Sequence, residues 1–130
     1  MEGRCQTPEK HSHTIPEGRG YWLTENLWAA AAQLPVKRVR IDDVAEFNRD
    51  CWFGDRHAAS IRNVAEHARR ISDADLTHPI ILSSDGRLLD GGHRLAKAYL
   101  AGQVEVLAVQ FDKDPDPDWV EATKAGGGPP

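Results

Sequence analysis

Residues 79–98 read PIILSSDGRLLDGGHRLAKA, and this stretch decides the fold. The apolar run Pro79–Ser83 predicts a buried strand, because it is short and rich in β-branched residues. Ser84-Asp85-Gly86 predicts a hairpin turn, since glycine adopts positive φ without steric cost. Arg87–Asp90 predicts the returning strand. Gly91-Gly92 then breaks the chain before a predicted helix over residues 93–101.

The flanking sequence adds a small number of further elements. They are a helix over Glu25–Gln33 capped by Thr24, a strand over Val36–Ile41, a helical turn over Asp42–Phe47, an amphipathic helix over Ala58–Ile71 with one apolar stripe, a strand over Val104–Phe111 and a last helical turn over Asp118–Thr123. Because helices and strands do not alternate regularly, we do not expect a doubly wound sheet. We expect a small mixed α/β (α+β) domain with a short mixed sheet flanked by helices.

The length of 130 residues suits one domain. Residues 1–20 are rich in glycine, proline and charge, and we expect a flexible N-terminal arm. The domain itself is predicted over residues 21–120. Residues 121–130 are expected to be a disordered C-terminal tail.

The formal net charge of -4 argues against a protein that holds nucleic acid by bulk charge. Five acids and two bases fall between Asp112 and Pro130, which gives -3 there and leaves -1 for residues 1–111. A nearly neutral body can still contain a local basic cluster. DNA is therefore a disfavoured partner, whereas a single small anion is not.

Cys5 and Cys51 do not make a disulfide framework, and the first residues lack the apolar core of a secretory signal. No apolar run approaches about 20 residues, the length that spans a membrane. We therefore expect a cytoplasmic protein with no membrane partner.

The start of the predicted helix at residue 93 is suited to an anion. The first amide groups of a helix have no internal partners, and the helix dipole favours negative charge there. Gly91 and Gly92 allow a bulky ligand to approach the backbone. His93 could donate a hydrogen bond to a phosphate or transfer a proton, and Arg94 and Lys97 could both face the same anion.

Asp90 ends the strand beside these glycines. Its carboxylate could hold Mg²⁺, orient His93 or cap the helix. The same segment also suits a plain structural role, with Asp90 as a cap, the glycines as an ordinary turn and the two cations as a solvated face. The residues alone leave these alternatives open.

Residues 79–111 resemble the core of the ParB/sulfiredoxin-like superfamily, in which a strand, a turn and a strand lead to a box of the D-G-x-H-R type at a helix start. Here the box reads Asp90-Gly91-Gly92-His93-Arg94. The resemblance covers about a quarter of the chain in detail. Sulfiredoxins carry an essential cysteine where this chain has Gly92, so the resemblance does not extend to their chemistry.

The box is most similar to that of the free serine kinases of the superfamily, which binds nucleotide phosphates. The resemblance implies ATP or ADP, with Mg²⁺, held over Gly91, Gly92, His93 and Arg94, with Lys97 nearby. CTP is also compatible, because partition ParB proteins bind it at a related box. ParB proteins place a helix-turn-helix region after the box, and we do not expect one here.

A small-molecule kinase or NTP hydrolase would also need a carboxylate that accepts a proton from the attacking hydroxyl. Glu46 is the first candidate, with Asp43 and Asp50 behind it, alongside His93 and Asp90 in the box. The phosphate acceptor would be a small molecule. The alternative functions are a ParB-type partition or regulatory module and a ParB-like nuclease acting on DNA.

Other residues suggest packing more than chemistry. Trp52-Phe53 could stack on a base or anchor its loop to the core. Cys51 is interpreted as a small packing residue, and His67 as a residue at the edge of its helix. His57, His67 and His78 lack the spacing of metal ligands.

Overall fold

The computed structural model describes residues 10–55 and 57–122. Their contacts divide the chain into two compact units, one made from the described parts of Met1–Gln33 and Lys113–Pro130, and one from Leu34–Asp112. The predicted domain over residues 21–120 includes the whole of the second unit and part of the first. All the predicted site residues belong to the unit Leu34–Asp112.

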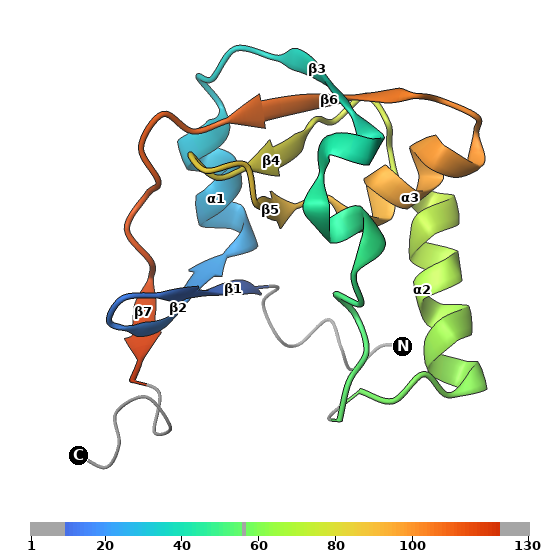
Figure 1. Ribbon diagram of the computed structural model, residues 1–130, viewed down its shortest axis with the longest axis horizontal. Coiled ribbons are helices and arrows are strands. Elements are labelled where there is room, and N and C mark those ends of the chain that lie inside the picture. The colour runs from blue at the N-terminus through green and yellow to red at the C-terminus, as the bar shows by residue number, and fades with distance from the viewer. Residues whose placement is uncertain (1–9, 56, 123–130) are drawn as a thin grey trace. The chain divides into compact units, whose positions relative to one another are not determined.

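That unit is built on a four-stranded mixed sheet (Figure 1). Its strands are β3 (Lys37–Arg40), β4 (Ile80–Leu82), β5 (Leu88–Asp90) and β6 (Glu105–Gln110), and their order is β3-β6-β4-β5. β4 runs parallel to β6, whereas β3 pairs with β6, and β5 with β4, in antiparallel fashion. The helices of the unit are η2 (Ile41–Asp43), η3 (Ala45–Asn48), α2 (Ile61–Asp73) and α3 (Gly92–Leu100). The predicted mixed α+β class with a short mixed sheet is confirmed.

The hairpin between β4 and β5 forms as the sequence predicted. Gly86 turns the chain with φ of +87°. The Ser83 hydroxyl donates to Asp85 and accepts from the Arg87 amide at 2.9 Å, so the turn is held by its own side chains. This hairpin delivers β5 to the start of α3.

One face of the sheet and the inner face of α3 share a hydrophobic core. Its buried members are Ile41, Val44, Ile80, Leu82, Leu95, Ala98, Val106 and Ala108. Leu95 and Ala98 stand three residues apart on α3 and therefore lie on the same helical face. Their burial fixes the start of α3 against the end of β5.

α2 packs in a different orientation from the one its pattern predicted. None of its residues is fully buried, and the apolar stripe is largely at the surface, with Ile61 92% and Val64 47% exposed. His67 is instead partly buried and approaches α3. The helix starts as expected from a capping residue, since Ser60 accepts a hydrogen bond from the Asn63 amide at 3.1 Å.

The other unit contains β1 (Lys10–Ile15), β2 (Gly18–Leu23), α1 (Thr24–Ala31) and β7 (Trp119–Glu121). Its three-stranded antiparallel sheet has the order β1-β2-β7. The Asp118 carboxylate accepts hydrogen bonds from the Leu23 amide at 2.7 Å and from Asn26 at 2.8 Å. These contacts join segments that are more than 90 residues apart in the sequence.

Three local predictions from the sequence differ from the observed structure of this unit. The segment predicted as an arm over residues 1–20 contains β1 and the start of β2, because the two strands pair with each other. The predicted helical turn at residues 118–123 is the strand β7, which pairs with β2. Thr24 is the first residue of α1 and not its cap, and its hydroxyl makes no hydrogen bond to any described residue.

The predicted tail at residues 121–130 falls mostly outside the described residues. Among the helices of residues 10–55 and 57–122, none has both the length and the apolar character needed to cross a membrane.

Candidate functional site

The box at residues 90–94 forms the junction between β5 and α3. Gly91 is the N-cap of α3 and has a left-handed backbone with φ of +118°. The first hydrogen bond of the helix runs from the Leu95 amide to the Gly91 carbonyl at 2.9 Å. Among the residues that the structure describes, no side chain caps this helix. The amides of Gly92, His93 and Arg94 therefore precede the internal hydrogen bonds of α3, as expected for an anion site.

The position of Gly91 tolerates no side chain. A Cβ atom there would lie 2.6 Å from the Cγ2 atom of Ile80. Both the positive φ and this close contact require glycine. Gly92 is different, because its Cβ would meet only Trp52, with 3.2 Å to the indole Nε1 atom.

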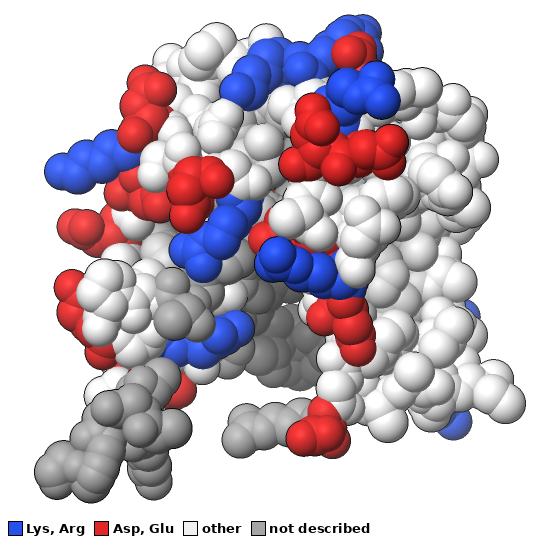
Figure 2. Space-filling model, in the orientation of Figure 1, with Lys and Arg blue, Asp and Glu red and all other residues white. Residues whose placement is uncertain are grey.

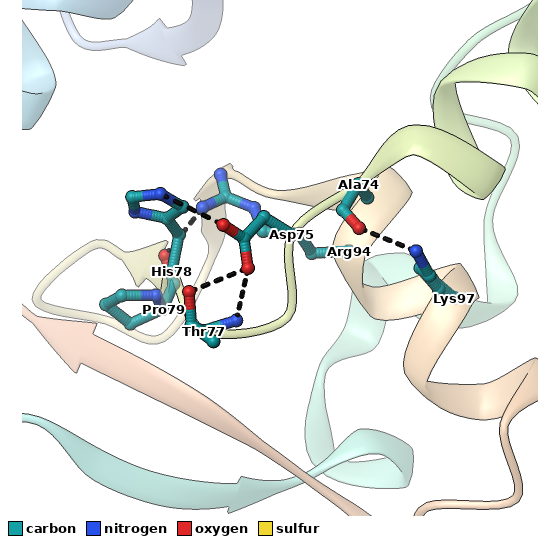
Figure 3. Close-up of polar contacts among 7 residues, drawn as sticks. All are labelled: Ala74, Asp75, Thr77, His78, Pro79, Arg94 and Lys97. Atoms are coloured by element: carbon teal, nitrogen blue, oxygen red, sulfur yellow. Dashed lines mark hydrogen bonds and ion pairs between the residues drawn. The ribbon is translucent and has the colours of Figure 1, made fainter.

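Asp90 and Arg94 form a largely buried ion pair. The Arg94 guanidinium lies 2.7 Å from the Asp90 carboxylate, and the two side chains are 12% and 11% exposed. Arg94 also donates to the Pro79 carbonyl at 3.0 Å (Figure 3). The pair therefore joins the end of β5, the first turn of α3 and the start of β4.

Lys97 is likewise engaged with the backbone. Its ammonium donates to the carbonyls of Ser72 at 2.7 Å and Ala74 at 2.8 Å, where α2 ends. Figure 3 shows Arg94 and Lys97 extending from α3 towards the segment between α2 and β4. A phosphate would have to compete with these protein acceptors for either cation. Within residues 10–55 and 57–122, no protein acceptor competes for the amides of Gly92, His93 and Arg94.

Exposed positive charge is also present at the opposite edge of the sheet from β5. Lys37, Arg38 and Arg40 of β3 are exposed, and Figure 2 shows basic side chains gathered where β3 lies in Figure 1. Acidic side chains lie beside them, and Arg40 is 3.9 Å from Asp42. β3 therefore presents mixed charge and not a uniformly basic surface.

His93 is partly buried beneath an aromatic side chain that sequence analysis did not place here. The Trp52 ring stacks on His93 with centroids 4.6 Å apart and planes 9° apart. Asp50 positions the loop, since its carboxylate accepts from the amides of Trp52 at 3.2 Å and Phe53 at 2.7 Å. Trp52 thus covers both His93 and Gly92.

Two further histidines lie against His93. His67 Nδ1 is 2.8 Å from His93 Nε2, and His67 Nε2 is 3.3 Å from His57 Nε2. The three residues come from the loop before α2, from α2 and from α3, which are separated by 10 and 26 positions in the sequence. Local spacing therefore could not reveal the cluster. The orientation of α2 about its axis, which directs His67 inwards, is visible only in the packed structure.

The environment disfavours the charged forms of His67 and His93. Burial is the largest cause that lowers the pKa of His93 to about 4, followed by His67 and Arg70. Burial, then Arg70 and His57, also lowers the pKa of His67. His93 is therefore neutral near pH 7 but only a weak base there, because an efficient general base has a pKa near the operating pH.

The three carboxylates predicted as candidate bases, Glu46, Asp43 and Asp50, lie outside the junction of β5 and α3. Glu46 lies in η3 beside Phe47. The ring centroid of Phe47 is 5.1 Å from that of Tyr99, which lies near the end of α3. One Glu46 oxygen is buried without a hydrogen-bond partner among the described residues. Asp43 is exposed in η2, and Asp50 supports the Trp52 loop. The proposed base is therefore in the unit that carries the box, but on a different element.

The residues present do not fit a resident magnesium site. The Asp90 carboxylate is paired with Arg94, and the described part of the chain contains no group of three or more His, Cys, Asp or Glu residues that could hold a metal ion. Burial and the carboxylates of Glu46 and Asp50 raise the pKa of the Cys51 thiol, which disfavours its nucleophilic thiolate.

No protein-family model matches this chain, and neither a curated protein nor a solved structure shows significant similarity to it.

Proposed function

We propose that the start of α3 binds the phosphate groups of a nucleotide, with ATP or ADP as the leading ligands and CTP as the alternative. The observation that carries the proposal is the uncapped start of α3 at the left-handed Gly91. At the start of α2, in contrast, the Ser60 side chain accepts a hydrogen bond from one of the first amides, that of Asn63. Unpaired amides together with the helix dipole favour an anion.

The surrounding residues support phosphate binding in three ways. Neither Gly91 nor Gly92 has a side chain that would block access to the amides. The Trp52 indole N–H, beside Gly92, and His93 are additional hydrogen-bond donors close to the same amides. Arg94 contributes by positioning, because its ion pair with Asp90 holds the junction of β5 and α3 rigid.

We extend the proposal to phosphoryl transfer to a small-molecule acceptor or to water. In this reaction a base removes the proton of the attacking hydroxyl as the phosphoryl group leaves the nucleotide. His93, neutral because of its lowered pKa, and Glu46, with its buried unpaired oxygen, are the two candidates. Magnesium would arrive with the nucleotide, and no step depends on a resident ion.

The test is calorimetric titration of wild type with ATP, ADP and CTP, followed by two variants at Gly92. Gly92→Asp and Gly92→Asn add side chains of nearly equal size, so their difference isolates the carboxylate charge. We expect Gly92→Asp to bind about tenfold more weakly than Gly92→Asn, since a charge beside the phosphates costs roughly 1.4 kcal/mol.

Thermal unfolding of the same two variants provides the control. An acidic residue in the first turn of a helix stabilises it by about 0.3–1 kcal/mol, so Gly92→Asp should be at least as stable as Gly92→Asn. Weaker binding by the more stable variant cannot result from unfolding. Absence of nucleotide binding by wild type, or equal affinities of the two variants, would refute the proposal.

A further inference from the structure

The three histidines beside Trp52 form a continuous chain of ring contacts, which we call the histidine chain: His57, His67 and His93. His67 is the central member and uses both of its ring nitrogens, one towards each neighbour. The centroids of His67 and His93 are 5.1 Å apart, and their planes differ by 19°. With 2.8 Å between their nitrogens, these rings meet edge to edge in nearly one plane.

Trp52 lies flat on this pair of imidazoles. Its centroid is 4.8 Å from that of His67 and 4.6 Å from that of His93, with planes 11° and 9° apart. Phe53 closes the other end of the chain, because it stacks on His57 with a 2° angle and meets His67 edge-on. The position of Trp52 over Gly92 therefore depends on two imidazoles that are held together by a hydrogen bond.

The number of protons that this chain can hold is limited. Each of its two contacts requires one N–H and one lone pair, so each contact holds one proton. The two outer nitrogens can hold one proton each. The intact chain therefore accommodates four protons, which is one more than three neutral imidazoles carry. A second added proton would force two N–H groups to face each other within one contact.

The charged groups around the chain oppose its protonation. Arg70 on α2 and Arg94 on α3 face it with positive charge, whereas Glu66 on α2 and Asp90 at the end of β5 face it with negative charge. Asp90 is already neutralised by Arg94 at 2.7 Å. Burial adds to the effect, and the pKa values of His67 and His93 are both lowered. Separated, solvated imidazoles therefore bind protons more readily than the assembled chain does.

We propose that the histidine chain is an acid-sensitive latch that holds Trp52 over Gly92 while its imidazoles are neutral and releases Trp52 when they are protonated. Opening the latch removes the indole from the first amides of α3. The effect of this opening on ligand access rests on the proposed nucleotide site, but the latch itself does not.

The test follows the indole N–H resonance of Trp52 and the ring nitrogens of the histidines by NMR, from about pH 8 to about pH 4. We expect the Trp52 resonance to move in one transition steeper than a single-proton titration, with its midpoint below the ordinary histidine value of about 6.5. The ring nitrogens of His67 and His93 should titrate in the same transition. No nucleotide is present, so the result is independent of the proposed function.

Three variants separate the latch from a general acid effect. His67→Phe keeps an aromatic ring beneath Trp52 but removes both proton contacts, and should abolish the steep Trp52 transition. His57→Ala removes only an exposed member and should reduce its steepness to that of one proton. His78→Gln, at an exposed histidine 3.5 Å from Asp75, should leave it unchanged.

Two results would overturn the latch. One is a Trp52 resonance that stays fixed in wild type while the histidines titrate. The other is a set of three histidines that titrate independently near the ordinary value. Both are measured on wild type, so the proposal remains testable if His67→Phe does not fold.

Discussion

The ion pair between Asp90 and Arg94 predicts a large loss of stability in Arg94→Met. The substitution keeps much of the aliphatic volume but removes the 2.7 Å contact to Asp90 and the 3.0 Å hydrogen bond to the Pro79 carbonyl. The Asp90 carboxylate would remain buried without the Arg94 guanidinium. Removing one partner of a buried pair costs about 3–5 kcal/mol, and the lost carbonyl bond is part of that cost. We expect about 3–4 kcal/mol in the free energy of unfolding.

The assay is urea unfolding followed by circular dichroism, with Arg87→Met as the matched control. Arg87 also pairs with an aspartate, but at 3.5 Å from Asp85 and with the two side chains 37% and 63% exposed. A surface pair of this kind contributes less than about 1 kcal/mol. The control variant should therefore unfold close to wild type.

A double-mutant cycle with Asp90→Asn isolates the pair itself. The double variant has no unpaired buried charge, so it should lose less stability than the sum of the single variants, by about 1.5–3 kcal/mol. A cost below about 1 kcal/mol for Arg94→Met, or additive single effects, would refute the reasoning. It would mean that Arg94 does not hold the junction of β5 and α3.

Three other variants and conditions give further predictions. Gly91→Ala should lose about 2–4 kcal/mol in chemical unfolding, because it adds a Cβ 2.6 Å from Ile80 at a left-handed position; wild-type stability would contradict this. Ser60→Ala should lose about 1 kcal/mol in the same assay by removing the cap of α2, and no loss would show that the cap is dispensable. The lowered pKa of His93 stabilises the folded state above the ordinary histidine value, and this stability is lost as the pH falls towards about 4. From pH 6.5 down to about pH 4, the free energy of unfolding should fall by about 1–2 kcal/mol more in wild type than in His93→Gln. This value allows for partial solvent screening. Parallel pH profiles of stability for the two proteins would contradict the prediction.

The β4–β5 hairpin and the start of α3 could be predicted from the sequence because local chemistry determines them. The short apolar run before Ser84 forms the buried strand β4. Gly86 adopts the positive φ that the following turn requires. Gly91 ends the strand and begins the helix for the same conformational reason. These positions needed no knowledge of distant partners.

The strands β1, β2 and β7 could not be predicted in this way. Their residues lack clear apolar alternation, and they are strands because they pair with one another. The helical turn predicted to begin at Asp118 does not form. The Asp118 carboxylate instead accepts hydrogen bonds from Leu23 and Asn26 and does not cap its own segment. β7 pairs with β2 from far away in the sequence, so its own short segment carries no sign of this partner.

The candidate site was predictable in part. The sequence indicated a helix start suited to an anion, but it left a cap by Asp90 open and did not show the partners of the cations. Arg94 and Lys97 could be assigned to one helix face, yet only the fold shows that both bind carbonyls between α2 and β4. The contact of His67 with His93 was hidden because the apolar stripe of α2 predicted the opposite packing, with His67 at the edge.

Backbone amide NMR during ATP titration tests the central claim most directly, since it observes the groups proposed to hold the phosphates. We predict saturable shifts for the amides of Gly92, His93 and Arg94, with those of β3 unchanged. Unchanged amides at the start of α3 with millimolar ATP, or shifts confined to β3, would contradict the account.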